Sequence, residues 1–182
     1  MHARTMLIAI SLVMAGCSTE DVVEAPDAEE VAVIEGTTAD LKRADPDIQR
    51  FFDQAHAYVI FPSVGEGGLV VGGARGTGWV YEKGNLVGQA KMTQISIGAQ
   101  AGGQSYAEVI FFRDRTALNA FKAGKTELGA EVSAVVLKSR AAKTAGYDPS
   151  GLAIFVLPKG GAMAEAAVGG QKFSYEPLGA EE

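Results

Sequence analysis

The sequence predicts an α+β fold: a strongly curled, glycine-rich and mainly antiparallel sheet of about eight strands, with two or three helices. Three observations predict it. Apolar residues recur at helical spacings before residue 57, short β-rich segments separated by turn residues follow, and 12 glycines fall within residues 65–103. Glycine inside strands marks bends, bulges or close backbone approach, so we expect strong curling, with a barrel-like closure as an alternative.

The first 16 residues have the pattern of an export signal. Arg4 supplies a positive charge, and residues 6–15 form an apolar run that is followed by small residues. At 1.5 Å per residue this run is too short to span the hydrocarbon of a bilayer. We therefore expect a signal peptide at residues 1–16, with a core helix or a membrane anchor as the alternative.

A single cysteine follows this run. The segment Met14-Ala-Gly-Cys17 resembles the lipobox of bacterial lipoproteins, in which the cysteine is acylated and becomes the new N-terminus. One unpaired thiol is unusual in an exported protein unless it is used in this way. The resemblance implies lipid attachment at Cys17, and two or more acyl chains hold a protein stably in a membrane. Because Ser18 follows rather than aspartate, we expect the outer membrane of a bacterial cell envelope, on the periplasmic side.

Charge divides the rest of the chain. Residues 20–35 hold seven acidic residues and no Lys or Arg, whereas residues 36–182 hold 15 of each sign. An acidic stretch after a lipid anchor is typical of a solvated coil, although a binding tail for a basic partner is an alternative. We therefore expect a lipidated acidic linker at residues 17–36 and a folded domain at residues 37–182.

The folded domain is expected to begin with helices. Apolar residues recur there at helical spacings: Leu41, Ile48, Phe51, Phe52 and Ala55. Asp45 can cap a helix that has Pro46 at its first position, where the missing amide hydrogen costs nothing. We expect a short helical turn near residues 38–44 and a helix near residues 46–56. Farther along, Asp114 can cap a helix over residues 115–122 that ends at Gly124.

The predicted strands are short and separated by turns. The first four cover residues 58–61, which stop at Pro62, and then residues 77–82, 86–90 and 93–101, with a turn at residues 83–85. Later strands are expected at residues 106–112, 130–137, 152–157 and 171–175, and residues 162–168 are a candidate for one more. Residues 138–150 are expected to form a loop.

Residues that carry chemistry are few. His56 is the one histidine after the predicted cleavage site, it has no nucleophile pattern near it, and no cysteine other than Cys17 is present. Zinc sites need three or four ligands at fixed spacing, and none is found. The stretch Gly73–Gly78 reverses the order of a dinucleotide fingerprint and lacks the ending of a P-loop. We expect no catalytic residue, no metal, no cofactor and, because the domain is neutral, no nucleic acid partner.

Basic and aromatic residues gather before the sheet: Lys42, Arg43, Arg50, Phe51 and Phe52. A helix with bases on one face and phenylalanines on the other can lie in the headgroup region of a membrane. The alternative, which the pattern alone favours, is a helix that packs its phenylalanines on the sheet and exposes its charges.

Several strings resemble the SYLF domain, the lipid-binding module of the Ysc-type actin-regulator family. They are residues 57–78, with Phe-Pro-Ser-Val and Gly-Gly-Ala-Arg-Gly-Thr-Gly, and residues 97–105, 128–135 and 161–170. The resemblance covers about residues 40–178. It implies binding of phospholipid, and of phosphoinositide in eukaryotic members, through a basic amphipathic segment that corresponds here to residues 38–56. The actin role of the yeast relatives does not transfer to an exported lipoprotein.

We therefore expect a non-catalytic, membrane-anchored protein that binds phospholipid. A structural lipoprotein that binds a protein or a glycan without lipid affinity is the alternative, and an enzyme of unrecognised type comes third. The candidate lipid contacts are Lys42, Arg43, Arg50, Phe51, Phe52 and Arg75. Arg75 lies between glycines, where its side chain can reach a phosphate or brace the sheet by bonding loop carbonyls, and the bracing role is favoured.

Overall fold

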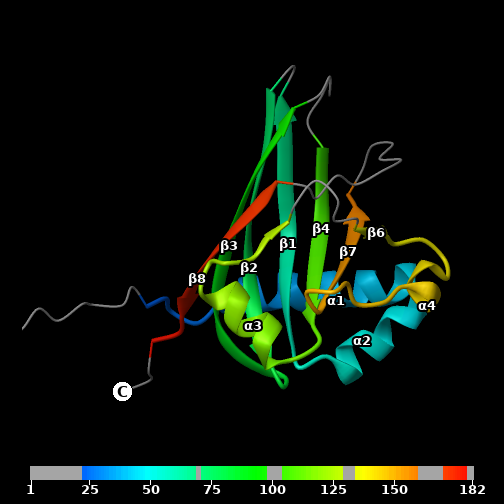
Figure 1. Cartoon of the computed structure of the whole chain (residues 1–182), viewed down its shortest axis with the longest axis horizontal. Coiled ribbons are helices and arrows are strands. Elements are labelled where there is room, and N and C mark those ends of the chain that lie inside the picture. The colour runs from blue at the N-terminus through cyan, green and yellow to red at the C-terminus, as the bar shows by residue number, and fades with distance from the viewer. Residues whose placement is uncertain (1–21, 69–70, 98–103, 129–133, 160–169, 180–182) are drawn as a thin grey trace, which may run out of the picture.

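A computed structural model of the chain describes residues 22–68, 71–97, 104–128, 134–159 and 170–179 (Figure 1). The helices of this part are α1 (Ala28–Ala44), the 3-10 helix η1 (Pro46–Ile48), α2 (Gln49–Gln54), α3 (Arg115–Lys122) and α4 (Ala141–Thr144). The strands are β1 (Ala57–Gly68), β2 (Val71–Glu82), β3 (Asn85–Ile97), β4 (Gln104–Phe112), β5 (Glu127–Leu128), β6 (Val135–Val136), β7 (Leu152–Pro158) and β8 (Gln171–Pro177). Among these described helices, none has the length and apolarity needed to cross a membrane.

The eight strands form one sheet in the order β5-β8-β3-β2-β1-β4-β7-β6. Every neighbouring pair is antiparallel except β6 and β7. The predicted α+β class with a mainly antiparallel sheet is confirmed. The described strands leave β5 and β6 as two separate edges, so the sheet is open and does not close on itself.

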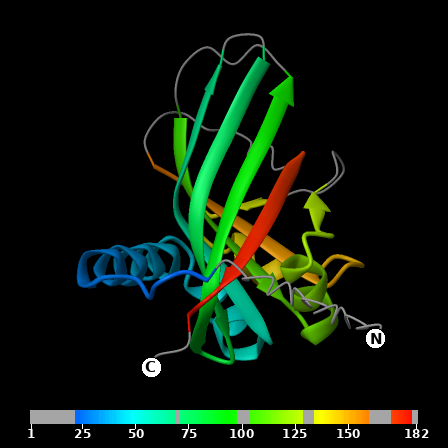
Figure 2. The same ribbon diagram turned by 90° about the vertical axis from the view of Figure 1, so that its left-hand side faces the viewer.

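Helices cover both faces of the sheet. Figure 2 shows α1 on one side of the long strands and α3 on the other, with the strands rising beyond both helices. The side chains of α3 pack into a core that includes Phe61, Phe112 and Phe173. The opposite core contains Ile34 and Leu41 of α1 together with Trp79 and Phe155. Strands β1, β2, β4 and β7 therefore bury alternate residues in two different cores.

The curl of the sheet depends on close backbone approach. A Cβ atom at Gly78 would lie 2.6 Å from the carbonyl oxygen of Ile60, and one at Gly88 would lie 2.5 Å from that of Glu176. No side chain tolerates such contacts, so glycine is required where these strands bend. A bulge in β1 at Pro62 adds to the curl, because its register shifts against both neighbouring strands there.

Several predicted strand limits were wrong. β1 continues through Pro62 to Gly68, because the proline lies in the bulge, where the ladder is interrupted and no amide hydrogen is needed. Residues 86–90 and 93–101 were expected as two strands, but residues 85–97 form the single strand β3. The expected loop at 138–150 contains α4, and β5 was not expected. The candidate strand at 162–168 lies outside the described residues.

The predicted caps were right. Asp114 accepts a hydrogen bond of 3.1 Å from the amide of Ala117 and starts α3 at Arg115, and Gly124 follows the helix with φ +64°. Asp45 accepts a bond from the amide of Asp47 and begins η1 with Pro46 at its first position. The helix expected near residues 46–56 is therefore present as η1 and α2 in succession.

The expected acidic coil at residues 17–36 was wrong from residue 28 onward, because α1 begins there. Asp27 and Glu30 form a capping box, in which each side chain accepts a hydrogen bond from the other's backbone amide, at 2.8 and 3.2 Å. The carboxylates of this first turn also suit the positive end of the helix dipole. Just before α1, the amide of Val23 donates to the carbonyl of Pro177, at 2.9 Å, so the chain is already joined to the sheet there.

Candidate functional site

The two predicted aromatic lipid contacts lie in or against the core. Phe51 is 3% exposed, and its ring packs against those of Phe111, Tyr147 and Phe155. Phe52 is half-buried and stands edge-on to Phe111, with ring centroids 4.8 Å apart. In this conformation Phe51 is not available to insert into a membrane. The structure agrees with the alternative prediction, in which the helix packs its phenylalanines on the sheet.

The basic residues of the same segment also have partners inside the protein. Arg50 donates to the carbonyls of Ala142 and Ala145 and lies over the ring of Phe51, 4.5 Å from its centroid. The Nζ atom of Lys42 lies 4.8 Å from the centroid of Phe52, and Arg43 pairs with Asp40 on the same helix. These contacts fasten α1, α2 and α4 together, so the segment serves the fold.

Arg75 has a different setting. It lies on β2, and its exposed side chain makes no hydrogen bond or ion pair with any described residue. The bracing role that the sequence favoured therefore finds no support in this part of the chain. Because side chains alternate along a strand, Arg75 shares its face of the sheet with Thr77 and Trp79, which is the face that α1 covers.

An open groove of about 880 Å³ lies between the first half of α1 and this face of the sheet. The helix contributes the acidic side chains of its first turn together with Val33 and Ile34. The sheet contributes Arg75 and the buried side chain of Trp79, and its remaining lining residues are mostly polar or small: Ser63, Gly76, Thr77, Lys91 and Thr93, with Pro62 and with Met92, whose side chain belongs to the core on the other face. The groove thus combines an apolar floor with charged walls.

The two walls of the groove carry opposite charge. The helix wall has Asp27, Glu29 and Glu30, and two of these are engaged in the capping box. On the sheet wall Lys91 is paired with Glu176 at 2.6 Å, which leaves Arg75 as the cation that no described acid neutralises. Such a site can hold a phosphate or a carboxylate that carries an apolar chain.

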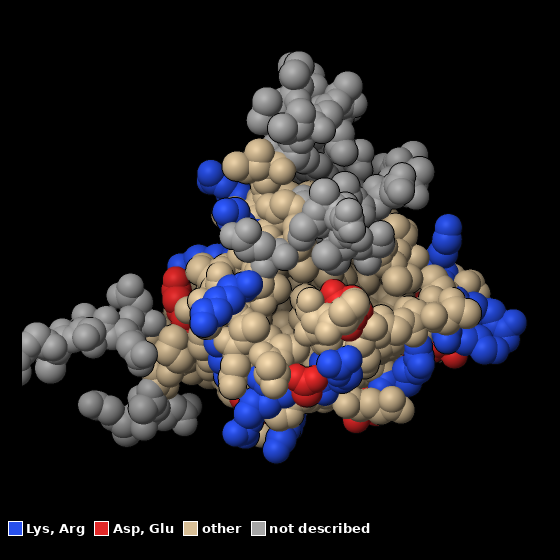
Figure 3. Space-filling model, in the orientation of Figure 1, with Lys and Arg blue, Asp and Glu red and all other residues tan. Residues whose placement is uncertain are grey.

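Charge is otherwise dispersed. Figure 3 shows Lys and Arg side chains spread over one face of the molecule with Asp and Glu among them. The whole chain has a formal net charge of -6. A diffuse positive field is therefore absent, and binding of an anion must rest on a few direct contacts.

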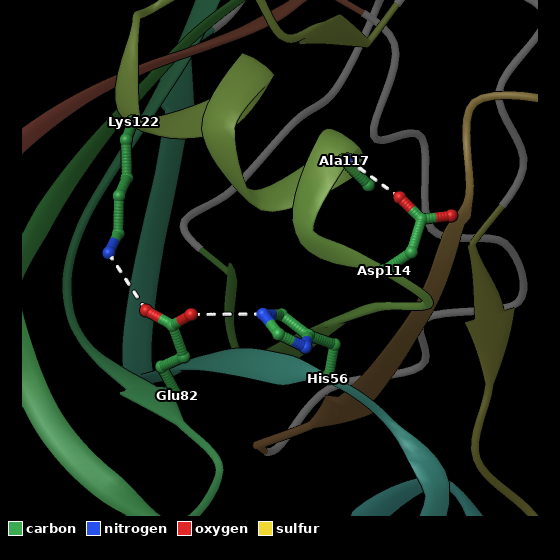
Figure 4. A network of polar contacts seen from close by, with 5 residues as sticks. All are labelled: His56, Glu82, Asp114, Ala117 and Lys122. Carbon is green, nitrogen blue, oxygen red and sulfur yellow. Dashed lines mark hydrogen bonds and ion pairs between the residues drawn. The ribbon is translucent and has the colours of Figure 1, made fainter.

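Glu82, the last residue of β2, lies in a polar network beside the turn that joins β2 to β3. Its carboxylate contacts Nε2 of His56 at 2.9 Å and Nζ of Lys122 at 3.2 Å, and Figure 4 shows these residues approaching it from different elements. Burial alone would raise the pKa of Glu82, but the hydrogen bonds from Lys122 and His56 hold it below its ordinary value. His56, which has no nucleophile pattern near it in the sequence, thus has a hydrogen-bonding partner within the fold. No group of three or more potential metal ligands is found among the described residues.

A second polar cluster lies inside the core on the α3 side. Glu108 of β4 and Gln171 of β8 are fully buried, and Gln94 and Tyr106 lie beside them. Burial raises the pKa of Glu108 to about 7, although the hydrogen bond from Gln171 opposes this shift. This cluster was not predicted from the sequence, and the signal that could have indicated it is a lone acid within the apolar strand predicted at residues 106–112.

The groove was also missed by the sequence analysis, apart from Arg75. The pattern Asp27-x-x-Glu30 is a capping-box signature that predicts a helix start at residue 28, and it was interpreted as part of a linker. Cys17 lies outside the described residues, so its acylation stays a prediction.

Comparison with known proteins gives two similarities. Residues 93–176 match the model of the Ysc84 family, described as Las17-binding protein actin regulator. Beta cell expansion factor A of Aeromonas veronii is 30% identical over 152 residues, which cover 80% of this chain and 58% of that protein. The chain therefore spans little more than half the length of that relative. The family match, at residues 93–176, extends from the second half of β3 into β8. It includes three of the four sequence segments that resemble the SYLF domain, and the segment at residues 57–78 lies outside it.

Proposed function

Because the chain carries a domain of the Ysc84 (SYLF) family, we propose that it is a membrane-anchored protein of the bacterial cell envelope whose folded part binds phospholipid. In this proposal acyl chains on Cys17 hold the protein at the membrane, and the domain contacts lipid headgroups without catalysing a reaction. The family in general binds lipids and actin-related partners, and an exported protein meets only the first of these.

The observation that supports lipid binding best is the position of Arg75. A guanidinium group with no described acid beside it lies in the wall of a groove whose floor is apolar. A guanidinium holds a phosphate through paired hydrogen bonds, and the exposed side chain of Val33, with the buried Ile34 and Trp79 behind it, offers apolar surface to an acyl chain. A phospholipid presents both groups together, which a simple inorganic anion does not.

The lipid contacts that were predicted in the helical segment before β1 contribute less to the proposal than Arg75 does. Phe51 is buried, the exposed Arg50 is bonded to the carbonyls of Ala142 and Ala145, and the charge of Arg43 is met by Asp40. Lys42 and Phe52 are half-buried against each other. We therefore assign the headgroup contact to Arg75 and treat the basic segment as a support for the helices.

Vesicle binding tests the proposal. A chain that begins at Ser18 keeps every described element and has neither the apolar leader nor an acyl group. We expect it to co-sediment with vesicles of phosphatidylethanolamine and phosphatidylglycerol, and Arg75→Ala to weaken binding about fivefold, since one basic residue at an anionic surface contributes about 1 kcal/mol. Arg75→Ala should leave the melting temperature unchanged.

Arg43→Ala is the matched control, because it also removes one exposed arginine, but outside the groove. If both variants lost the same amount of vesicle affinity, the lipid contact would have to be assigned to the basic segment at residues 38–56 or to overall charge, and not to the groove. A chain that stays in the supernatant with every headgroup would favour the structural lipoprotein that binds a protein or a glycan.

Anchoring is tested separately in cells. Cys17→Ala should abolish incorporation of labelled palmitate and leave the precursor without its normal processing. Labelled palmitate in the Cys17→Ala protein would show that the lipobox interpretation is wrong.

A further inference from the structure

Glu108 and Gln171 come from distant strands. β8 and β4 are separated in the sheet by β3, β2 and β1, so in a flat sheet they would lie about 19 Å apart at the usual spacing of ~4.8 Å. The side chains nevertheless meet: Nε2 of Gln171 donates to Oε2 of Glu108 at 2.9 Å. The curl brings the two strands face to face, and this bond crosses the interior between them.

The contact is buried and incompletely satisfied. Both residues are 0% exposed. Oε1 of Glu108 and Oε1 of Gln171 have no hydrogen-bond partner among the described residues. Three further contacts, which join Gln171, Tyr106 and Gln94, are long, at 3.4 to 3.5 Å. Two buried acceptors without a donor are costly, and a proton on the carboxyl of Glu108 turns one of these acceptors into a donor.

No positive charge in the described part of the chain meets this carboxyl. The titratable side chain that faces it from β4 is Tyr106, and Gln94 and Gln171 are its neighbours from β3 and β8. Lys172, next to Gln171 in the strand, is exposed and points to the other face of the sheet, and Lys159 is exposed after β7. An ionised carboxylate held by a single amide in an apolar core is strongly disfavoured.

We propose that Glu108 and Gln171 form a proton-dependent clasp that fastens β8 to β4 across the interior of the curled sheet. While Glu108 carries its proton, the acid and the amide satisfy each other as a hydrogen-bonded pair. When the proton is lost, the carboxylate gains from contact with water, and the strands at this end of the sheet separate more readily. The aromatic core next to the clasp, with Phe61 and Phe173, is then less well covered.

The direction of the pH dependence follows from the raised pKa. The folded protein binds a proton at Glu108 up to about pH 7, whereas the unfolded chain releases it near the ordinary value of 4.5. Between these values the folded state holds more protons, so stability falls as the pH rises. A fall in melting temperature of roughly 5–10 °C is expected across this window.

Hydrogen exchange on the full-length protein tests the clasp. Amide protection in residues 104–112 and 171–177, corrected for the intrinsic exchange rate, should drop several-fold between about pH 5.5 and about pH 8.5. Glu108→Gln keeps the size of the side chain and stays uncharged, and its own amide can satisfy Gln171 at any pH. This variant should therefore keep its protection at the higher pH.

Glu176→Gln is the matched control, because it removes an acid from β8 that lies on the other face of the sheet and pairs with Lys91. It should show the pH dependence of the unaltered protein. The clasp is rejected if the unaltered protein keeps its protection across the range, or if Glu108→Gln loses protection with pH as the unaltered protein does.

Discussion

Phe51 of α2 packs edge-on against Phe155 of β7, with ring centroids 4.8 Å apart. Phe111 and Tyr147 complete the ring cluster around Phe51, at 5.4 and 5.6 Å. The cluster joins the short helix α2 to the core on the α1 side of the sheet. A residue that the sequence predicts as a lipid contact is thus part of what holds α2 on the sheet.

Phe51→Ala should lower the free energy of unfolding by about 3–5 kcal/mol, because the substitution removes a buried ring and leaves a cavity. Phe52→Ala should cost distinctly less, since Phe52 is only half-buried. Urea denaturation of both variants measures the difference. If Phe51→Ala were as stable as the unaltered protein while losing vesicle binding, Phe51 would be a lipid contact as the sequence predicted.

Arg50 is predicted to be a structural residue. Arg50→Ala removes the bonds to the carbonyls of Ala142 and Ala145 and the contact over the ring of Phe51, and it should cost about 1–2 kcal/mol. Faster amide exchange in residues 141–145 should accompany the loss. Arg43→Ala, whose partner Asp40 is exposed on the same helix, should change stability by less than about 0.5 kcal/mol.

Local signals explain why part of the fold could be predicted from the sequence. Caps and turns depend on a few adjacent residues, so Asp45, Asp114 and the turn at Lys83–Gly84 were found where the sequence indicated them. The continuation of β1 through Pro62 depends on a bulge between two neighbouring strands, and no local pattern specifies it. The two-residue strand β5 is likewise defined by its partner β8.

The candidate site was harder to predict for the same reason. Arg75 could be named from its glycine-rich string, but its groove forms only when α1 lies against the sheet. The clasp joins residues 63 positions apart in sequence, which periodicity cannot relate. The start of α1 was a different failure: its capping box was visible in the sequence, but seven acids without a base suggested a coil.

The lowered pKa of Glu82 leads us to expect that the free energy of unfolding decreases at acid pH. The pKa of its carboxyl is lowered in the folded protein, so its contribution is present above its ordinary value of 4.5 and is lost as the pH falls through the lower, folded value. Glu82→Gln should cost less than about 1 kcal/mol near neutrality, because the pairs are partly exposed. The difference from the unaltered protein should shrink below about pH 4.5. Thermal denaturation from acid to neutral pH measures it, and a difference that grows on acidification would contradict the assignment.

The apolar floor of the groove gives the sharpest prediction about lipid. Val33 and Val31 are both exposed valines of α1, at 49% and 38%, but only Val33 lines the groove. Val33→Glu and Val31→Glu therefore make the same change of charge and nearly the same change of helix propensity. If an acyl chain covers the exposed half of Val33, its replacement should weaken binding to phosphatidylethanolamine and phosphatidylglycerol vesicles about three- to tenfold. Val31→Glu should bind as the unaltered chain does, and both variants should keep their melting temperature. Equal losses for the two variants would mean that added negative charge, and not contact in the groove, had reduced the affinity, and the acyl-chain site would have to be sought elsewhere on the domain.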